Sequence, residues 1–352
     1  MKSHRALYIL SALSSAFMVL CYSCRTEGGG TEQSEEVNPF SNPVIYYAPD
    51  PSIIDDRSRT GFFYAYSTQA LGDYTSTPNL PIWRSKDFVH WDKVGDAFPH
   101  RPEWREKSRV WAPDINYFDG HYVLYYALGG PDSKYNASGV AVSDTPEGPF
   151  KDLGMLVSVE NTGVCNSIDP NFFEDGGHKY LFWGSYTSGS GVWMAELSDD
   201  GLSLKTGTGI INVGNENMEG TYIHKHGEYY YMFASMGSCC DGAKSSYHIV
   251  VGRSKDIHGP FVDPAGKPMT ENGYSYTIMQ TSVDKRFTGP GHNAEIFSDD
   301  SGQEWMPYHA SWSGTGYNSR GMNIDKIYWK DGWPCFETGH PTATRQNGPV
   351  WK

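Results

Sequence analysis

A motif of three short strands repeats five times from about residue 44 onward, and this repeat constrains the fold more than any other feature of the chain. Each copy has a turn glycine followed by a dense aromatic strand, and these glycines are Gly61, Gly120, Gly177, Gly227 and Gly302. A short strand that opens with a polar residue precedes each glycine, and a strand of apolar and small residues follows. Such repetition indicates stacked supersecondary units, because one unit cannot bury both of its faces alone.

The repeat predicts an all-β protein with the architecture of a five-bladed β-propeller. The composition agrees, since 39 glycines and 51 aromatic residues among 352 (24 Tyr, 16 Phe and 11 Trp) are typical of many short strands joined by tight turns. A β-sandwich with a second domain is the alternative, and five matched copies argue against it. We assign residues 1–23 to a signal peptide, 24–40 to a flexible tether and 41–352 to the propeller domain.

The innermost strands of a propeller line a central channel, and their equivalent ends meet at one mouth. The polar residues that open the five copies are Asp50, Asp114, Asp169, Glu219 and His292. If they are equivalent, several carboxylates share one site, where neighbouring negative charges drive their pKa values apart. One ionised and one protonated carboxyl are what acid/base hydrolysis of a glycosidic bond requires. The alternative for each acid is an ordinary turn role, and Asp114 fits equally well as a residue that ties down its own strand.

These residues lie in motifs of a known family. The motifs are Asp50-Pro-Ser-Ile-Ile, Trp111-Ala-Pro-Asp-Ile, Asn166-Ser-Ile-Asp-Pro-Asn, Glu219-Gly-Thr-Tyr-Ile, Gly289-Pro-Gly-His-Asn-Ala-Glu-Ile and the run from Cys239 through Val-Gly-Arg-Ser to Phe261. With them, the chain from about Asn42 to Trp333 resembles glycoside hydrolase family 43, and more narrowly its endo-1,5-α-L-arabinanases. The Cys-Cys run and the Gly-Pro-Gly-His element are the most specific of these motifs.

The resemblance implies hydrolysis of α-1,5-linked arabinan, a pectin side chain, with inversion of the anomeric configuration. It implies that Asp50 is the general base, that Glu219 is the general acid, and that Asp169 orients this acid and raises its pKa. An inverting mechanism needs room for a water, with the carboxyls roughly 6.5–9.5 Å apart. The substrate-binding residues that it implies are Trp111, Asn166, Ser167, Ile168, Ser185, Tyr186 and Thr187.

The resemblance also implies a calcium ion on the propeller axis, beside or bound to His292 and otherwise held mostly by water. A single neutral nitrogen is an unusual ligand for a cation that prefers oxygen. A buried, hydrogen-bonded histidine is therefore the alternative, and the acid/base chemistry itself requires no cofactor.

Three positions depart from the arabinanase pattern. Tyr186-Thr187 stands where many arabinanases have Phe-Trp, Pro49 stands where a histidine is common, and Thr221 stands where a proline is common. These changes leave open an exo-acting α-L-arabinofuranosidase or a β-xylosidase of the same family. A non-catalytic sugar-binding propeller is the alternative of another class, although a binding module has no need of all three acids.

The N-terminus predicts export. Lys2 and Arg5 precede an apolar run from Ala6 to Leu20, which is typical of a secretory signal. Cys24 and the polar, glycine-rich tether after it resemble a lipoprotein cleavage site, so we expect a lipid-anchored protein of a Gram-negative cell surface or periplasm. An ordinary signal peptide cut nearby is the alternative.

The net charge, hydropathy and cysteine spacing exclude several classes of binding partner. The net charge of −13 argues against nucleic acid, and the mean hydropathy of −0.53 excludes a protein with many membrane spans. We therefore expect a polysaccharide or oligosaccharide partner and contact with a membrane only through the lipid. The later cysteines, Cys165, Cys239, Cys240 and Cys335, have no zinc-finger spacing. A disulfide is the alternative in an exported protein, but neighbours such as Cys239 and Cys240 rarely pair, so we expect buried apolar roles.

Overall fold

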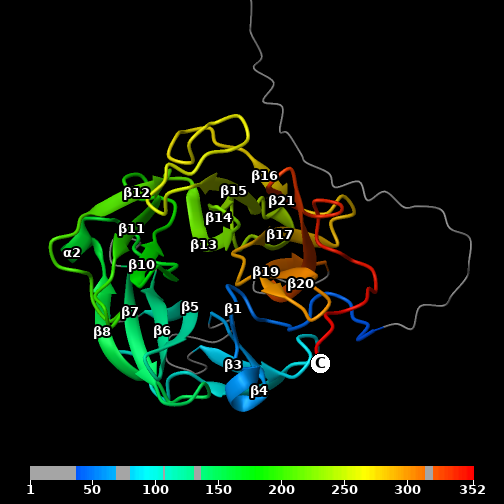
Figure 1. Ribbon diagram of the computed structural model, residues 1–352, viewed down its shortest axis with the longest axis horizontal. Helices are drawn as coiled ribbons and strands as arrows, with labels where there is room; N and C mark the ends of the chain where they lie inside the picture. The colour runs from blue at the N-terminus through cyan, green and yellow to red at the C-terminus, as the bar shows by residue number, and fades with distance from the viewer. Residues whose placement is uncertain (1–36, 69–79, 106–107, 131–135, 314–319) are drawn as a thin grey trace, which may run out of the picture.

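Five antiparallel sheets surround a central axis in the computed structural model, as Figure 1 shows. The structure describes residues 37–68, 80–105, 108–130, 136–313 and 320–352. The predicted signal peptide, Cys24 and nearly all of the predicted tether lie outside these ranges. In the part of the chain that is described, no helix combines the length and the apolar character needed to cross a membrane.

Each sheet is one blade, with its strands in chain order from the axis outward. Blade 1 has β1 (Ser52–Asp55), β2 (Phe63–Tyr66), β3 (Pro81–Ser85) and β4 (Asp92–Asp96); blade 2 has β5 (Arg109–Phe118), β6 (His121–Gly129), β7 (Ala137–Ser143) and β8 (Lys151–Val157); blade 3 has β9 (Asn171–Asp175), β10 (His178–Trp183), β11 (Val192–Glu196) and β12 (Ile210–Gly214). Blade 4 has β13 (Met218–His226), β14 (Tyr229–Met236), β15 (His248–Ser254) and β16 (Thr277–Met279); blade 5 has β17 (Phe287–Gly291), the short β18 (Phe297–Ser298), β19 (Glu304–Trp312), β20 (Arg320–Lys330) and β21 (Trp333–Cys335). Only single helical turns are added among the described residues, namely α1 (Arg57–Thr60), α2 (Val159–Thr162) and η2 (Gly242–Lys244). The predicted five-bladed propeller is confirmed.

The five turn glycines of the repeat have the backbone conformation that the pattern predicts. All of them have positive φ angles, between 61° and 86°, a region that residues with a Cβ rarely adopt. The three strands predicted for each copy are present in blades 1 to 4. In blade 5 the predicted strand opening at His292 is wrong, because residues 292–296 are irregular and separate β17 from β18. A fourth strand closes each blade on the outside. The sequence does not reveal this outer strand, because segments such as β4 (Asp-Lys-Val-Gly-Asp) are short, polar and half-exposed.

The aromatic strands form the interfaces between blades. Phe182 of β10, Phe233 of β14 and Tyr308 of β19 are fully buried members of one apolar cluster that joins blades 3, 4 and 5. Burial of a side chain of this size contributes about 2–3 kcal/mol, so the dense aromatic repeat is the main source of cohesion between blades.

The ring closes through the residues that precede β1. The backbone N–H of Val44 donates to the carbonyl of Met322 in β20 at 2.8 Å, and the N–H of Met322 donates to the carbonyl of Ile45 at 2.9 Å. Phe40 exchanges a second pair of backbone hydrogen bonds with Gln346 near the C-terminus. The first blade is thereby tied to the last, so neither has an unprotected side face.

Asp325 is the buried centre of this closure. Its carboxylate accepts hydrogen bonds from the Tyr308 hydroxyl at 2.5 Å, the Thr342 backbone N–H at 3.1 Å and the Gln346 side chain at 3.2 Å. The Asn42 side chain, from the N-terminal segment, donates to the same carboxylate at 3.4 Å. One carboxylate thus joins the last blade to segments from both ends of the described chain.

The expectation of buried apolar roles is wrong for Cys239 and Cys240. Cys239 and Cys240 form a disulfide with each other, whereas Cys165 keeps a free thiol. The bonded pair lies in the loop between β14 and β15, just before η2, rather than among apolar core residues. The sequence argument failed because it took neighbouring cysteines as residues that rarely pair with each other.

Replacement of Asp325 by alanine is expected to destabilise the ring. The substitution leaves several buried donors without an acceptor, which corresponds to a loss of about 3 kcal/mol in the free energy of unfolding. Denaturant unfolding measures this loss, with Asp144→Ala as the control, because the Asp144 side chain is 89% exposed. Equal stability of the two variants would show that the closure does not depend on Asp325.

Candidate active site

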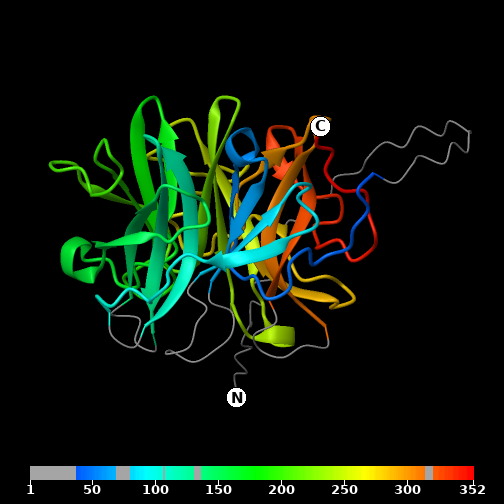
Figure 2. The same ribbon diagram turned by 90° about the horizontal axis from the view of Figure 1, so that it is seen from below.

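The channel mouth is built from residues with a left-handed backbone. Asp50, Asp169 and His292 have φ angles of 51°, 56° and 46°, and Ala112 and Gly220 take the corresponding places in blades 2 and 4 with φ of 40° and 56°. A non-glycine residue pays an energetic cost in this region, so surrounding contacts must hold it there. One such residue at the same end of each blade turns the chain inward at that end. Figure 2 shows the molecule from the side. The single turn η2 lies at the lower edge of this view and contacts β17 and β19.

This geometry brings four of the five predicted opening residues together at the mouth. The fifth, Asp114, does not lie there. Glu219 directly precedes the left-handed Gly220, so it points into the site with Asp50, Asp169 and His292. Asp114 lies two residues beyond Ala112, which places it about 6–7 Å deeper along β5. Equivalence of all five openings is therefore wrong for Asp114, because the left-handed position in blade 2 is the alanine.

Asp50 is surrounded by positive and polar groups from blade 5. Its Oδ1 atom accepts a hydrogen bond from Arg320 Nη1 at 2.7 Å and lies 3.0 Å from Nδ1 of His309. Nδ1 of His292 lies 3.4 Å from the same oxygen. Burial alone would raise the pKa of Asp50, but Arg320 and the two histidines outweigh it and hold the pKa well below its usual value. Asp50 is therefore ionised at neutral pH.

Glu219 has the opposite environment. Its carboxyl is buried and receives hydrogen bonds from the Ser185 hydroxyl at 2.5 Å and the Tyr247 hydroxyl at 2.8 Å. Burial raises the pKa of Glu219, and the two hydrogen bonds only partly offset that effect. A raised pKa favours the protonated acid, which can give a proton away.

Asp169 lies between these two acids. Its Oδ2 atom accepts the backbone N–H of Gly220 at 3.0 Å and is 3.9 Å from Nδ1 of His292. Burial and the negative charges of Glu219 and Asp50 raise the pKa of Asp169 well above its usual value. Asp169 is thus joined to the peptide directly after Glu219, which fixes where the glutamate side chain begins.

His292 links Asp50 and Asp169 through one nitrogen. Burial lowers the pKa of His292, so its ring is neutral at pH 7. Two carboxylates face Nδ1, and the described residues provide no hydrogen bond to Nε2. A neutral ring with its proton on Nδ1 leaves the Nε2 lone pair available to accept a hydrogen bond from water or to bind a cation.

Sequence reasoning missed three members of this site: His309, Arg320 and Tyr247. His309 is fully buried in β19, where it pairs with Gly291, the residue before His292, so a lone imidazole within an aromatic strand was an available signal. Tyr247 stacks on His309 with their ring centroids 5.6 Å apart. Arg320 gave no such signal, because an arginine at the start of a strand is ordinary.

The residues predicted to bind substrate fall into two groups. Ser167 is fully buried with its hydroxyl donated to the Val164 carbonyl, Ile168 is 9% exposed, and Ser185 is committed to Glu219. Asn166 is also buried and bonds to the Asn136 side chain at 2.7 Å. By contrast Tyr186 is 52% exposed, whereas Thr187 and Trp111 are half-buried. Tyr186 is therefore the most exposed residue of the predicted set, and the first group supports the site from beneath.

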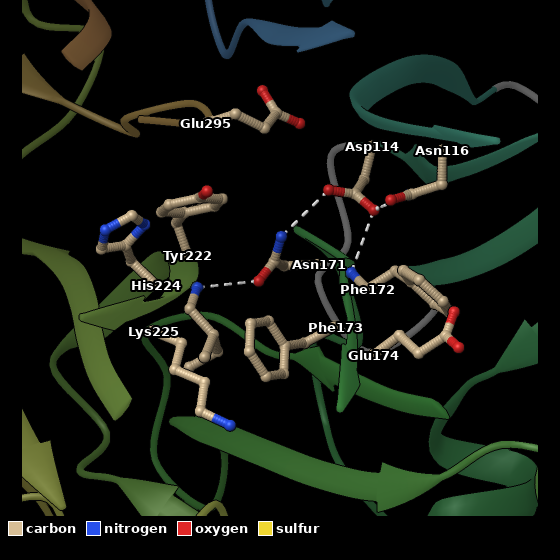
Figure 3. A pocket seen from close by; sticks show the side chains of 11 residues that line it. Asp114, Asn116, Asn171, Phe172, Phe173, Glu174, Tyr222, His224, Lys225 and Glu295 are labelled. Atoms are coloured by element: carbon tan, nitrogen blue, oxygen red, sulfur yellow. Dashed lines mark hydrogen bonds between the residues drawn. The ribbon is translucent and has the colours of Figure 1, made fainter. Parts of the chain in front are cut away.

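Asp114 belongs to a separate cavity of about 210 Å³ further along the channel, shown in Figure 3. Its carboxylate accepts hydrogen bonds from Asn116 at 2.7 Å, from the Phe172 backbone at 2.9 Å and from Asn171 at 3.0 Å. Burial raises the pKa of Asp114 to about 6 despite these bonds. Its contacts join blade 2 to blade 3, which is the structural role left open by the sequence.

Comparison with known proteins identifies the family of this acidic site. A model of the glycosyl hydrolases of family 43 matches residues 40–334. The chain belongs to glycosyl hydrolase family 43. The resemblance predicted from the motifs is confirmed, and the protein is a glycosidase.

Three relatives illustrate the range of this family 43 neighbourhood. The chain is 31% identical over 289 residues to an extracellular exo-α-(1→5)-L-arabinofuranosidase of Cellvibrio japonicus, covering 74% of this chain and 81% of that protein. It is 30% identical over 314 residues to extracellular endo-α-(1→5)-L-arabinanase 1 of Bacillus subtilis, covering 84% and 88%. A solved structure of Cellvibrio cellulosa α-L-arabinanase complexed with arabinohexaose has a TM-score of 0.72, 28% identity and coverage of 82% and 95%.

Removal of the Arg320 charge is expected to raise the pKa of Asp50. Arg320→Met deletes the nearest positive group while keeping much of the side-chain volume, so the pKa should increase by about 1–3 pH units. Carboxyl ¹³C NMR titration of Asp50 measures this change, and Arg320→Lys is the control because it keeps the charge. An identical Asp50 titration in the wild type and in Arg320→Met would contradict the assigned electrostatics.

Proposed function

We propose that this family 43 enzyme hydrolyses α-1,5-linked L-arabinofuranosyl bonds of arabinan by an inverting general acid/base mechanism. The observation that carries the proposal is the opposite electrostatic treatment of two acids in one buried site. The positive charge of Arg320 is the main cause that holds Asp50 ionised, and burial holds Glu219 towards its protonated form. The relatives named as arabinanases support arabinan as the substrate.

In the proposed reaction, the Asp50 carboxylate takes a proton from a water molecule as that water attacks the anomeric carbon. Glu219 gives its proton to the departing glycosidic oxygen, so the bond to the leaving sugar breaks as the new carbon–oxygen bond forms. Attack from the face opposite the leaving group inverts the configuration. Asp50 ends protonated and Glu219 ends ionised, and exchange with solvent restores both.

The remaining groups position these two acids. Ser185 and Tyr247 hold the two oxygens of Glu219, which limits rotation of the carboxyl. Asp169 holds the Gly220 N–H next to Glu219, and its own negative charge, when ionised, opposes loss of the glutamate proton. Tyr186, exposed beside the site, offers a flat face on which a furanose ring can pack.

Exo action is the second candidate, and a specific observation favours it. One of the relatives is named as an exo-acting arabinofuranosidase, at 31% identity. The replacement of the common Phe-Trp pair by Tyr186-Thr187 removes one large aromatic face from the region near the acid. A shorter aromatic platform suits recognition of one chain end more than continuous binding of a long polymer.

An early-time product profile distinguishes endo from exo action. The substrates are linear 1,5-arabinan, branched arabinan and arabinoxylan. We expect a ladder of oligosaccharides from the linear polymer, and arabinose or one short product alone would indicate the exo enzyme. Glu219→Gln should lower the rate by about 10²–10⁴-fold because it keeps the shape and removes the proton. The exposed Glu216→Gln, three residues earlier, is the matched control and should retain the wild-type rate. No release from any of the polymers, or near-normal turnover by Glu219→Gln, would contradict the proposal.

We also propose that Nε2 of His292 binds a hydrated calcium ion on the axis. Treatment with a chelator should lower the melting temperature of the wild type, and added Ca²⁺ should restore it, because a ligand of the native state stabilises that state. His292→Ala should remove this calcium response. A melting curve that is unchanged after verified removal of calcium would favour a purely structural histidine.

Export is supported by the relatives named extracellular, and we propose lipidation of Cys24 as the finer assignment. Membrane attachment would then come from the acyl chains and the tether alone. Incorporation of a labelled fatty acid by the wild type but not by Cys24→Ala checks this assignment, and equal incorporation by both would contradict it.

A further inference from the structure

A second group of chemically active side chains lies at the other end of the strand that carries Glu219. His224 and His226 follow it in β13, five and seven residues later, about 17–23 Å away at the usual rise of a strand. Residues two apart point to the same face of a strand, so both imidazoles face the neighbouring blade. Glu304, the first residue of β19, lies opposite them in blade 5.

The three side chains offer donor atoms to one point. One nitrogen of each histidine and one carboxylate oxygen of Glu304 all lie within 4.8 Å of one another. Nδ1 of His226 is 4.0 Å from Oε1 of Glu304. Donors bound to one tetrahedral ion at 2.0–2.1 Å are about 3.4 Å apart, so small side-chain rotations would close the set around a metal.

Neighbouring groups already orient two of these donors. The indole of Trp329 stacks on His226 with ring centroids 3.8 Å apart and planes 14° from parallel. The same indole donates its Nε1–H to Oε2 of Glu304, which leaves Oε1 on the side of His226. Outer-shell contacts of this kind fix the orientation of ligands at metal sites.

His224 supplies an independent observation that points to a missing ligand. Its Nε2 atom is buried and has no hydrogen-bond partner among the described residues. A buried polar atom without a partner costs about 1–3 kcal/mol, and the His226–Glu304 contact does not relieve this cost. Figure 3 shows the His224 ring beside Tyr222 at the wall of the channel cavity. A bound cation would satisfy the unpartnered nitrogen.

We propose that His224, His226 and Glu304 form a binding site for Zn²⁺ or a similar divalent transition metal. Two imidazoles and one carboxylate match the preference of such ions, whereas calcium prefers a shell of oxygens. Three protein ligands leave the fourth tetrahedral position to water. This site is distinct from His292, and it does not depend on the proposed reaction.

The ion would tie blade 4 to blade 5 at the end of the ring opposite the acids. Both histidines belong to the innermost strand of blade 4, and Glu304 belongs to the second strand of blade 5. A metal bond across this seam stabilises the folded ring and leaves the catalytic mouth unchanged. Zinc should therefore affect melting temperature and have little effect on the rate of hydrolysis.

The test uses the protein purified without a polyhistidine tag and freed of metal. Isothermal titration with ZnCl₂ in buffer that contains Ca²⁺ should give saturable binding of one Zn²⁺ per chain and a higher melting temperature. Co²⁺ should give the visible absorption of a nitrogen-coordinated ion. In the double variant His224→Gln/His226→Gln the affinity for the metal should fall at least about 100-fold. The binding signal and the cobalt absorption should therefore both be lost at the concentrations that saturate the wild type.

Two further variants keep the test decisive. His178→Gln alters another histidine–glutamate pair, in which Nδ1 of His178 is 2.7 Å from Glu196, and it should bind Zn²⁺ as the wild type does. Trp329→Phe keeps the stacking but removes the donor to Glu304, so we expect about 10–100-fold weaker binding even if the double variant fails to fold. Absence of saturable binding to the wild type, or equal binding by wild type, double variant and Trp329→Phe, overturns the proposal and leaves a structural ion pair.

Discussion

Closure of the ring is the constraint on which the rest of this protein depends. Each blade has two apolar faces, and both are covered only when the fifth blade meets the first. The segment before β1 provides that contact by pairing with β20, and the buried Asp325 carboxylate secures it. The active site lies on the same seam, because Asp50 follows the closing segment and meets Arg320 and His309 from blade 5.

This arrangement explains how two carboxyls in one buried site acquire opposite properties. Burial by itself would raise the pKa of both carboxyls. Their pKa values differ because the groups that contact Asp50 and those that contact Glu219 come from different blades. Asp50 accepts a hydrogen bond from the Arg320 guanidinium of blade 5, whereas Glu219, on blade 4, accepts hydrogen bonds from the neutral hydroxyl groups of Ser185 and Tyr247. The pKa values of Asp50 and Glu219 therefore depend on which blades lie next to each carboxyl in the closed ring.

The channel has a different chemistry at each depth. At the mouth, left-handed residues aim acids at one point; further in, Asp114 joins two blades through amide and backbone donors. Beyond it, His224 and His226 face Glu304 across the seam between blades 4 and 5. A single strand, β13, thus carries Glu219 at one end and the histidine pair at the other.

The sequence by itself determined the repeat, and through it the fold. Turn glycines and aromatic strands are local signals, because backbone freedom and apolar periodicity act within a few residues, and all five copies were found in this way. The same local patterns identified Asp50, Asp169, Glu219 and His292 as residues that gather at one mouth. Only the tertiary structure revealed Arg320, His309 and Tyr247 beside them, and only it excluded Asp114, whose depth depends on which residue of blade 2 turns left-handed. His309 and Arg320 lie 259 and 270 residues from Asp50 in the sequence, and ring closure brings them beside it. No local pattern encodes contacts between residues so far apart in the chain.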